Sequence, residues 1–271
     1  MRTVLALDDV LPLTCTRSGT CCHGKDIRIT PWELARLARA RGIPPRAFRE
    51  QFTEDAGTRL RLAAPGWRGL PACGLYEPTH GCSVHAARPL ACRLYPLGRE
   101  VQGGEVRIIH EGGSFPCLDG CPEVSTLPAL TVEAYLDGQG AEPFAQARDA
   151  YLELAQDLAD AAFTLVFDGG IGAGADRRWA NAWQVAVDGG PVAWPTVLGA
   201  PWHDRLTTPD ISVEDAGSWL EQHRGIMQQQ AELAAPAVAC VRLFASALLL
   251  FQAVGGEAGV MGRRWLVQAG V

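Results

Sequence analysis

Eight of the nine cysteines fall between positions 15 and 121, and this clustering constrains the fold more than any other feature of the chain. Thiolates are soft, negatively charged ligands, so a cluster of this kind is typical of a metal site. The alternative is a framework of disulfides, which requires an oxidising compartment. The clustered residues are Cys15, Cys21, Cys22, Cys73, Cys82, Cys92, Cys117 and Cys121.

The start of the chain favours metal over disulfides. Asp8 and Asp9 interrupt a short apolar run within residues 1–13, and no small-residue cleavage site follows, so we predict no secretory signal. Without export the protein is expected to be cytoplasmic. Thiols stay reduced there, and cysteine clusters usually bind metal or take part in catalysis. The sequence therefore predicts a metal-binding protein.

Charge is unevenly spread along the chain. Residues 1–125 hold 16 Lys and Arg against 13 Asp and Glu, a balance of +3, whereas the remainder holds 8 against 17, a balance of −9. The positive balance coincides with the cysteines, where it can offset the negative charge of thiolate–metal centres. Because the whole chain is acidic and has no dense basic run, we expect no nucleic-acid partner.

One apolar stretch, residues 237–254, raises the question of a membrane span. Arg242 and Gln252 bound its uninterrupted run Leu243–Phe251, which is much shorter than the ~20 residues that a span requires. We therefore expect a buried helix and no membrane partner. Cys240 lies in this helix and is interpreted as a small buried apolar side chain.

Capping signals and periodicity predict helices on both sides of the cysteine-rich part. The run Thr30–Glu33 combines a capping hydroxyl, a proline in the first turn and a carboxylate that can reach back, and Gly42 ends the helical spacing. Prolines 44 and 45 open a second short helix. Apolar residues recur every three or four positions over 144–165, which predicts a long amphipathic helix, and another helix is expected over 216–233.

The middle of the chain predicts little regular structure. Residues 57–100 show no sustained period and are interpreted as loops pinned by ligands, whereas Val101–His110, with two glycines at its centre, is typical of a hairpin. The predicted fold class is α+β and mostly helical. We expect a cysteine-cluster module over 1–125, loop-rich and stapled by metal, packed on a helical domain over 126–271.

The cysteines form three groups whose spacing carries a resemblance. The double cysteine of the first group, followed by the segment Arg88–Pro96, resembles the YkgJ family of cysteine-cluster proteins over about residues 13–122. The resemblance implies a zinc- or iron-chelating domain, named for a C-x-x-C-x-x-C-C signature. The groups read Cys15-Thr-Arg-Ser-Gly-Thr-Cys21-Cys22, then Cys73, Cys82 and Cys92-Arg-Leu-Tyr-Pro, then Cys117-Leu-Asp-Gly-Cys121.

One position departs from that signature, because Ser18 stands where its second cysteine belongs. The first group then offers three thiols instead of four, and Cys117 and Cys121 are candidates for the missing ligand. The resemblance implies metal binding and leaves the biochemical role open. A distant likeness to flagellin lysine N-methylase, which has a related cysteine-rich start, makes an iron–sulfur-dependent enzyme an alternative, although no catalytic residue can be named.

All eight clustered cysteines are candidate metal ligands, enough for two four-thiolate sites or for one with four thiols left over. Zinc sites usually take closely spaced pairs, and only Cys117–Cys121 has that spacing. Single cysteines from several loops suit an iron–sulfur cluster, expected to be [4Fe–4S], somewhat better. We favour an iron–sulfur protein with a redox or electron-transfer role over a zinc-binding structural or chelating protein, and leave a protein partner open.

Polar neighbours of the cysteines have two interpretations each. His23 and His85 could ligate metal, but a solvent-facing or hydrogen-bonding imidazole is the better interpretation. Arg88 and Arg93 could donate to cluster sulfur or form structural ion pairs, and the sequence does not decide between these roles. Lys25, the only lysine, is interpreted as an ordinary surface residue.

Overall fold

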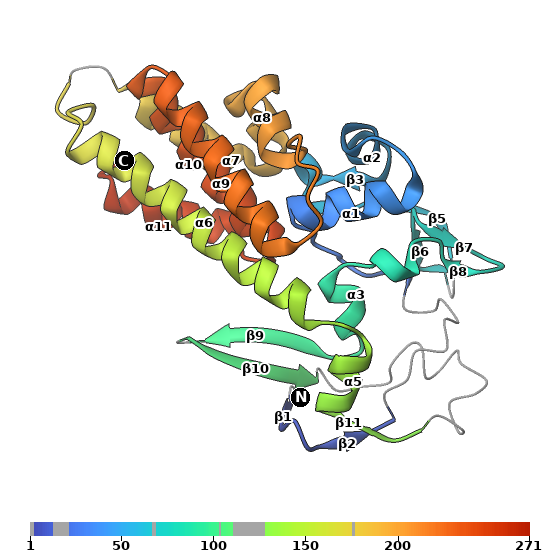
Figure 1. Ribbon diagram of the computed structural model, residues 1–271. Coiled ribbons are helices and arrows are strands. Elements are labelled where there is room, and N and C mark those ends of the chain that lie inside the picture. The colour runs from blue at the N-terminus through green and yellow to red at the C-terminus, as the bar shows by residue number, and fades with distance from the viewer. Residues whose placement is uncertain (1–2, 13–21, 67–68, 103, 111–127, 175–176) are drawn as a thin grey trace. The chain divides into compact units, whose positions relative to one another are not determined.

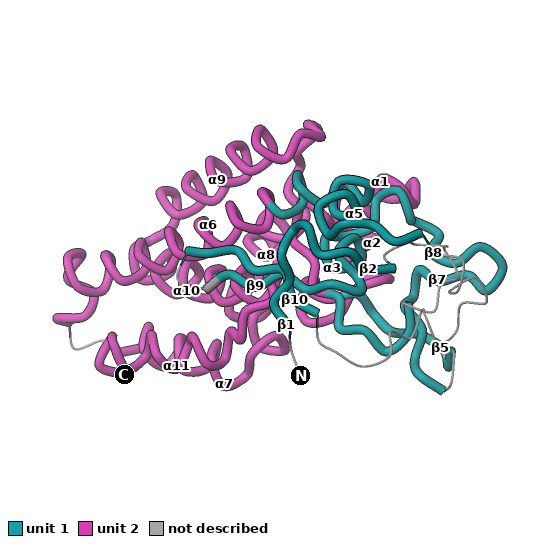
Figure 2. The backbone as a smooth tube through the Cα atoms, turned by 90° about the horizontal axis from the view of Figure 1, so that it is seen from below, with its two compact units in different colours: residues 1–27, 60–145 teal, residues 28–59, 146–271 magenta. Residues whose placement is uncertain are grey.

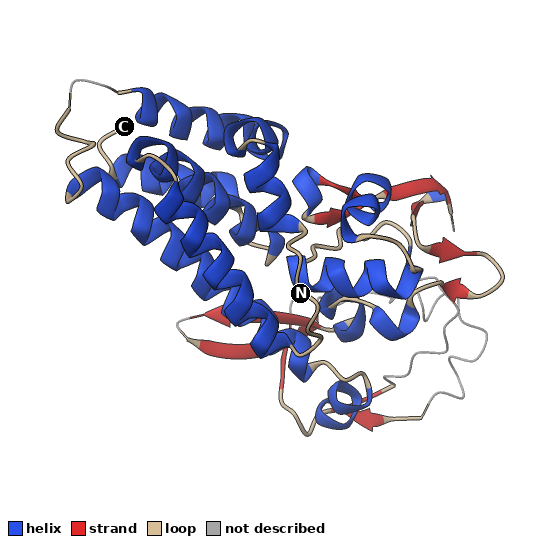
Figure 3. Cartoon of the chain, turned by 45° about the horizontal axis from the view of Figure 1, so that its top comes forward, coloured by secondary structure: helices blue, strands red, loops and turns tan. Residues whose placement is uncertain are grey.

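The computed structural model describes residues 3–12, 22–66, 69–102, 104–110, 128–174 and 177–271. It is α+β and mostly helical, which confirms the predicted fold class (Figure 1). The strands form one small three-stranded sheet and separate pairs, while the helices are far longer (Figure 3).

The chain divides into two compact units, each of which is discontinuous in sequence (Figure 2). Unit 1 comprises residues 1–27 and 60–145, and unit 2 comprises residues 28–59 and 146–271. The boundary predicted near residue 125 lies outside the described residues, so the division into domains at that point stays a prediction.

Unit 1 contains the predicted hairpin. Strands β9 (Gly98–Gln102) and β10 (Glu105–His110) are antiparallel, and Gly104 in the turn between them has a φ of 84°, which suits glycine. A third strand, β1 (Thr3–Leu5), pairs with β10 and was not predicted. The sheet supplies Ile108 to a small core. The other buried members of this core are Leu97, Val132 and Tyr135.

The rest of unit 1 consists of short elements. Residues expected to be loops form two strand pairs and a helix, because neighbouring segments satisfy each other's backbone groups over a few residues. Within residues 57–100 these are β5 (Leu62–Pro65) paired with β6 (Pro71–Cys73), β7 (Tyr76–Glu77) paired with β8 (Gly81–Cys82), and α3 (Leu90–Leu94), with the 3₁₀ helix η4 (His85–Ala87) before it. Outside that range unit 1 also contains β2 (Val10–Leu11) paired with β11 (Leu130–Thr131), and α5 (Val132–Gly138).

Unit 2 begins with the helix that the capping signals predicted. In α1 (Pro31–Arg41) the Thr30 hydroxyl accepts from the Glu33 backbone N–H at 3.3 Å, and the Glu33 carboxylate accepts from the Thr30 N–H at 2.8 Å. Gly42 ends the helix with a φ of 67°. Four further elements follow: α2 (Pro45–Phe52), β3 (Thr53–Glu54), η2 (Asp55–Gly57) and β4 (Arg59–Leu60).

The remaining helices build the core of unit 2. Trp183 stacks on Phe244 with ring centroids 4.0 Å apart, and Trp202 donates to the Ser246 hydroxyl at 2.8 Å. Helix α9 has the predicted bounds and begins at an Asp215 cap, because the Asp215 carboxylate accepts from the backbone N–H of Ser218. The helices are α6 (Glu142–Phe167), α7 (Arg178–Leu198), α8 (Ala200–Thr207), α9 (Ala216–Leu233), α10 (Pro236–Ala253) and α11 (Ala258–Gln268).

Helix α10 is the apolar segment that raised the question of a membrane. Among the described residues it is the one helix long and apolar enough to span a bilayer by composition, and 61% of it is buried inside the protein. Its central run packs as the core helix that the sequence predicted. Cys240 is fully buried, as expected, and burial raises the pKa of its thiol to about 12.

Candidate metal centre

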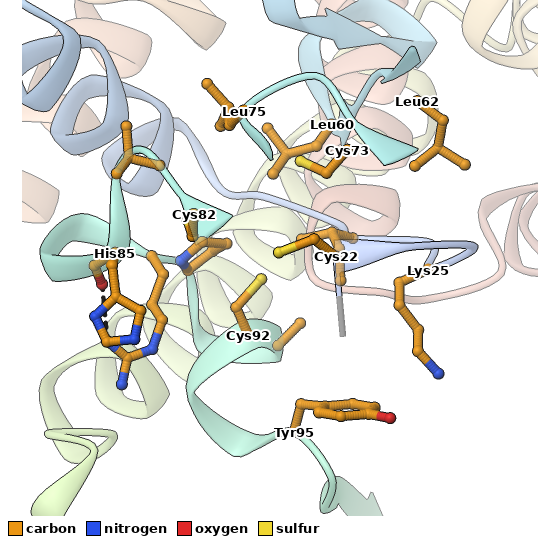
Figure 4. A pocket seen from close by; sticks show the side chains of 15 residues that line it. Cys22, Lys25, Leu60, Leu62, Cys73, Leu75, Cys82, His85, Cys92 and Tyr95 are labelled. Carbon is orange, nitrogen blue, oxygen red and sulfur yellow. Dashed lines mark hydrogen bonds between the residues drawn. The ribbon is translucent and has the colours of Figure 1, made fainter. Parts of the chain in front are cut away.

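Four of the eight candidate ligands line one cavity in unit 1. They are Cys22, Cys73, Cys82 and Cys92, and the cavity has a volume of about 60 Å³ (Figure 4). In this view the sulfur atoms of Cys22 and Cys92 point toward each other. The other four candidates, Cys15, Cys21, Cys117 and Cys121, lie outside the described residues.

Backbone pairing positions two of these cysteines. His23 forms an antiparallel bridge with Ala72, and Gly24 donates its N–H to the Pro71 carbonyl at 2.8 Å. Continuing this register by one residue places Cys22 opposite Cys73, and facing residues of antiparallel strands have their Cβ atoms about 5 Å apart. The double-cysteine segment is therefore held beside β6 by main-chain pairing.

Cys82 reaches the cavity from a second strand pair. It ends β8 and lies opposite Tyr76 in the β7–β8 register. The residue before it, Gly81, has a φ of 74°, a conformation that side chains rarely adopt. Ser83 donates twice to the Leu75 carbonyl, from its backbone N–H at 2.9 Å and from its hydroxyl at 2.8 Å. These bonds fix the chain on both sides of the thiol.

Arg93 anchors the helix that carries Cys92. Its buried guanidinium donates to the carbonyls of Ala86 at 2.7 Å, Arg88 at 2.9 Å and Gln139 at 2.5 Å, and lies 3.9 Å from the Phe144 ring centroid. A planar group with five donors can satisfy three carbonyls at once. These contacts with backbone carbonyls support the structural interpretation of Arg93.

Replacing Arg93 with lysine tests this anchoring role. Lysine keeps the charge but loses the fork and the contact with the ring, so we expect the free energy of unfolding of unit 1 to fall by about 2 kcal/mol. Hydrogen exchange of α3 amides measures it. Arg107→Lys, on the exposed hairpin, is the matched control and should change little. Equal effects of the two substitutions would contradict the assignment.

Arg88 and His85 form a second contact at the cavity wall. Arg88 donates to the His85 carbonyl at 2.7 Å, lies 3.2 Å from His85 Nδ1, and also donates to the Gln139 side chain. Because arginine only donates, Nδ1 accepts, and the proton of the neutral imidazole then lies on Nε2. In this arrangement His85 is a hydrogen-bonding imidazole whose Nδ1 accepts from Arg88, which agrees with the interpretation favoured from the sequence.

His23 is packed in the fold. It is 3% exposed, and its ring meets Tyr76 edge-on with centroids 4.5 Å apart. A Cβ added at Gly66 would come within 2.0 Å of the imidazole, so this glycine leaves the space that the ring occupies. His23 therefore has a packing role.

The remaining cavity wall was not predicted from the sequence. Apolar side chains contributed by distant segments cover much of it, and Lys25 is half-buried there with Nζ 4.7 Å from the Tyr95 ring centroid. Lys25 therefore contributes to the cavity wall, a position that the sequence did not predict. Only the nearness of Lys25 to Cys22 hinted at this position. The apolar residues are Ile27, Leu60, Leu62, Leu75, Val84, Pro89 and Ala91.

The donor set indicates which metals fit. Four thiols and no carboxylate line the cavity, and Lys25 and Arg88 supply positive charge at its wall. Thiolates select zinc and iron, whereas magnesium and calcium require oxygen ligands. As the described side chains stand, no three of His, Cys, Asp or Glu are close enough together to hold an ion. The cysteines thus share a cavity without forming a closed coordination shell among themselves.

Comparison with known families agrees with this donor chemistry. Residues 14–108 match the model of the CxxCxxCC family, a zinc- or iron-chelating domain. The match covers about a third of the chain and supports metal binding, with zinc or iron as the metal. No curated protein and no solved structure matches the chain.

Proposed function

We propose that the CxxCxxCC domain holds an iron–sulfur cluster, expected to be [4Fe–4S], and that the protein acts in electron transfer. One observation carries the proposal. Four cysteines from four separate segments line a single cavity with largely apolar walls. Cys22 precedes His23, while the other three lie in β6, β8 and α3. Single thiols that converge from separate segments suit a cluster, which supports the expectation drawn from the cysteine spacing.

The distribution of the ligands favours a cluster over zinc. A structural zinc site usually draws its thiolates as close pairs from one turn, and none of the four lining cysteines forms such a pair. A cluster, when bound, supplies reversible one-electron chemistry at a potential set by charge, hydrogen bonds to sulfur and exposure. The apolar wall limits water, while Lys25 and Arg88 lie where positive charge would offset the thiolates.

Serine substitutions test the ligand assignment. Anaerobically purified protein is expected to be brown and to contain iron and sulfide, and Cys22→Ser, Cys73→Ser, Cys82→Ser and Cys92→Ser should each lose most of both, because assembly of the site and folding are coupled. Cys240→Ala is the matched control. Its thiol is buried in unit 2 and should leave metal content unchanged.

The same preparation separates the two metals. Colourless protein that contains zinc and no sulfide would contradict the cluster and support the zinc-chelating alternative. Full metal content in all four serine variants would overturn the ligand assignment for either metal. An absorption spectrum with and without dithionite measures the redox change that the proposal requires.

A further inference from the structure

A second cavity lies in unit 2, away from every cysteine discussed above. It is an open groove of about 510 Å³ between helices α6 and α11, both of which end near the label C in Figure 1. We call it the α6–α11 groove. Its lining residues are Gln156, Asp160, Phe163, Thr164, Phe167, Asp168, Trp265 and Gln268.

The α6–α11 groove is electronegative for two independent reasons. Asp160 and Asp168 line it, and no lining residue is basic. The Asp160 carboxylate accepts from the Gln156 side chain at 2.8 Å, which leaves its charge unneutralised. In addition, the groove includes the last turns of both helices, where backbone carbonyls carry partial negative charge. Basic residues commonly occupy such turns, yet neither of these turns contains one.

The basic residues near this end of the unit include Arg263 and Arg264, just before the last turn of α11, and Arg177, and none of them lines the groove. Arg177 donates to the Gly270 carbonyl at 3.3 Å, beyond the end of α11, and lies 5.3 Å from the Trp179 ring. Its guanidinium is therefore engaged elsewhere. The surplus of negative charge extends over the whole C-terminal part, since residues 126–271 hold 8 basic against 17 acidic side chains.

Aromatic rings line the same groove. Phe163 and Phe167, one helical turn apart, are parallel within 7° with centroids at 5.9 Å, and Phe167 is 59% exposed. Exposing a large apolar ring costs free energy that a binding surface can recover. Aromatic faces also attract cations within about 6 Å. A groove lined by both aromatic rings and carboxylates therefore favours a cationic ligand.

We propose that the α6–α11 groove binds an arginine-bearing peptide segment of a partner protein. A guanidinium stacks flat on aromatic rings while its N–H fork reaches a carboxylate, so one arginine can use both chemistries of the groove. Lysine offers a point charge without the planar face. The groove is open and larger than one side chain, which suits a peptide better than an enclosed small cation.

Calorimetric titration of the full-length protein with a short synthetic peptide containing two arginines tests the proposal. The same peptide with citrulline in place of arginine keeps the shape and removes the charge. We expect the arginine peptide to bind, and Asp160→Asn, Asp168→Asn and Phe167→Ala each to weaken its binding about tenfold. Glu153→Gln is the matched control, an exposed carboxylate on α6 outside the groove, and should not change the affinity.

Three outcomes would overturn the proposal. Equal affinity for the arginine and citrulline peptides would show that charge does not drive binding. Unchanged binding by Asp160→Asn and Asp168→Asn would show that the peptide binds elsewhere. Self-association that the same substitutions abolish, measured by analytical ultracentrifugation, would assign the groove to a second copy of this chain. Circular dichroism verifies that each variant retains its helices, since all three substituted positions are exposed.

Discussion

Removal of the bound metal with a chelator is expected to unfold unit 1 while unit 2 stays folded. Metal binding to a thiolate site contributes on the order of 10 kcal/mol to folding, more than the whole stability of many small domains. In unit 1 we expect that contribution to supplement small buried clusters. One of these, within the described residues, consists of Leu97, Ile108, Val132 and Tyr135.

The lengths of the elements explain why the units should respond differently. In unit 1 the described strands have two to six residues, and α3 and α5 have five and seven. Isolated hairpins and helices of such length are unstable in water without further contacts. In unit 2 helices α7, α9 and α10 have 18 residues or more and bury several tryptophans.

Hydrogen exchange with mass spectrometry measures both units in one experiment. After chelation, peptides covering β6, β8 and α3 should exchange as fast as an unfolded chain, whereas peptides of α10 should stay protected. Unit 2 also holds seven of the eight tryptophans, so tryptophan fluorescence should barely change. Retained protection of α3 in protein shown to contain no metal would contradict the expectation.

Local signals in the sequence were sufficient for much of this fold. The capping box at Thr30 and Glu33, the glycine hairpin predicted over 101–110 and the periodic helix over 144–165 depend on neighbours within a few residues, and all three are present. The burial of Cys240 also followed from its apolar surroundings. Such features need no knowledge of distant parts of the chain.

Contacts between segments far apart in the chain could not be predicted from local sequence signals. The pairing of β1 with β10 joins residues about a hundred positions apart, and the donation from Arg93 to Gln139 links two segments with no shared pattern. The position of Lys25 beside Tyr95 depends equally on tertiary packing. Spacing indicated which thiols could ligate metal, but only the register of His23 with Ala72 places Cys22 opposite Cys73.

Acid is expected to destabilise unit 2 through one buried histidine. His223 on α9 is fully buried, and its Nδ1 shares a hydrogen bond with the Tyr151 hydroxyl at 3.0 Å. Burial lowers the pKa of His223 from 6.5 to about 4, while the carbonyls of Arg205 and Leu206 partly oppose that shift by attracting the charged ring. Nε2 makes no hydrogen bond within the described part of the chain.

The sign of the pH effect follows from this lowered pKa. The unfolded chain binds a proton near pH 6.5 and the folded chain only near pH 4, so stability is complete above about pH 6.5 and falls as the pH drops toward 4. The full effect is about 3 kcal/mol. His203, whose pKa is also lowered, chiefly by burial, adds in the same direction.

Urea unfolding followed by tryptophan fluorescence, repeated across this pH range, measures the effect. His223→Gln should lower stability at neutral pH, because the Tyr151 hydroxyl loses its buried partner, yet flatten the dependence on pH, because no proton is taken up at that position on unfolding. His80→Gln is the matched control, since His80 is exposed, and should keep the slope of the unsubstituted protein. If His223→Gln instead keeps that slope, the acid sensitivity of unit 2 arises from other groups, with His203 the first to substitute.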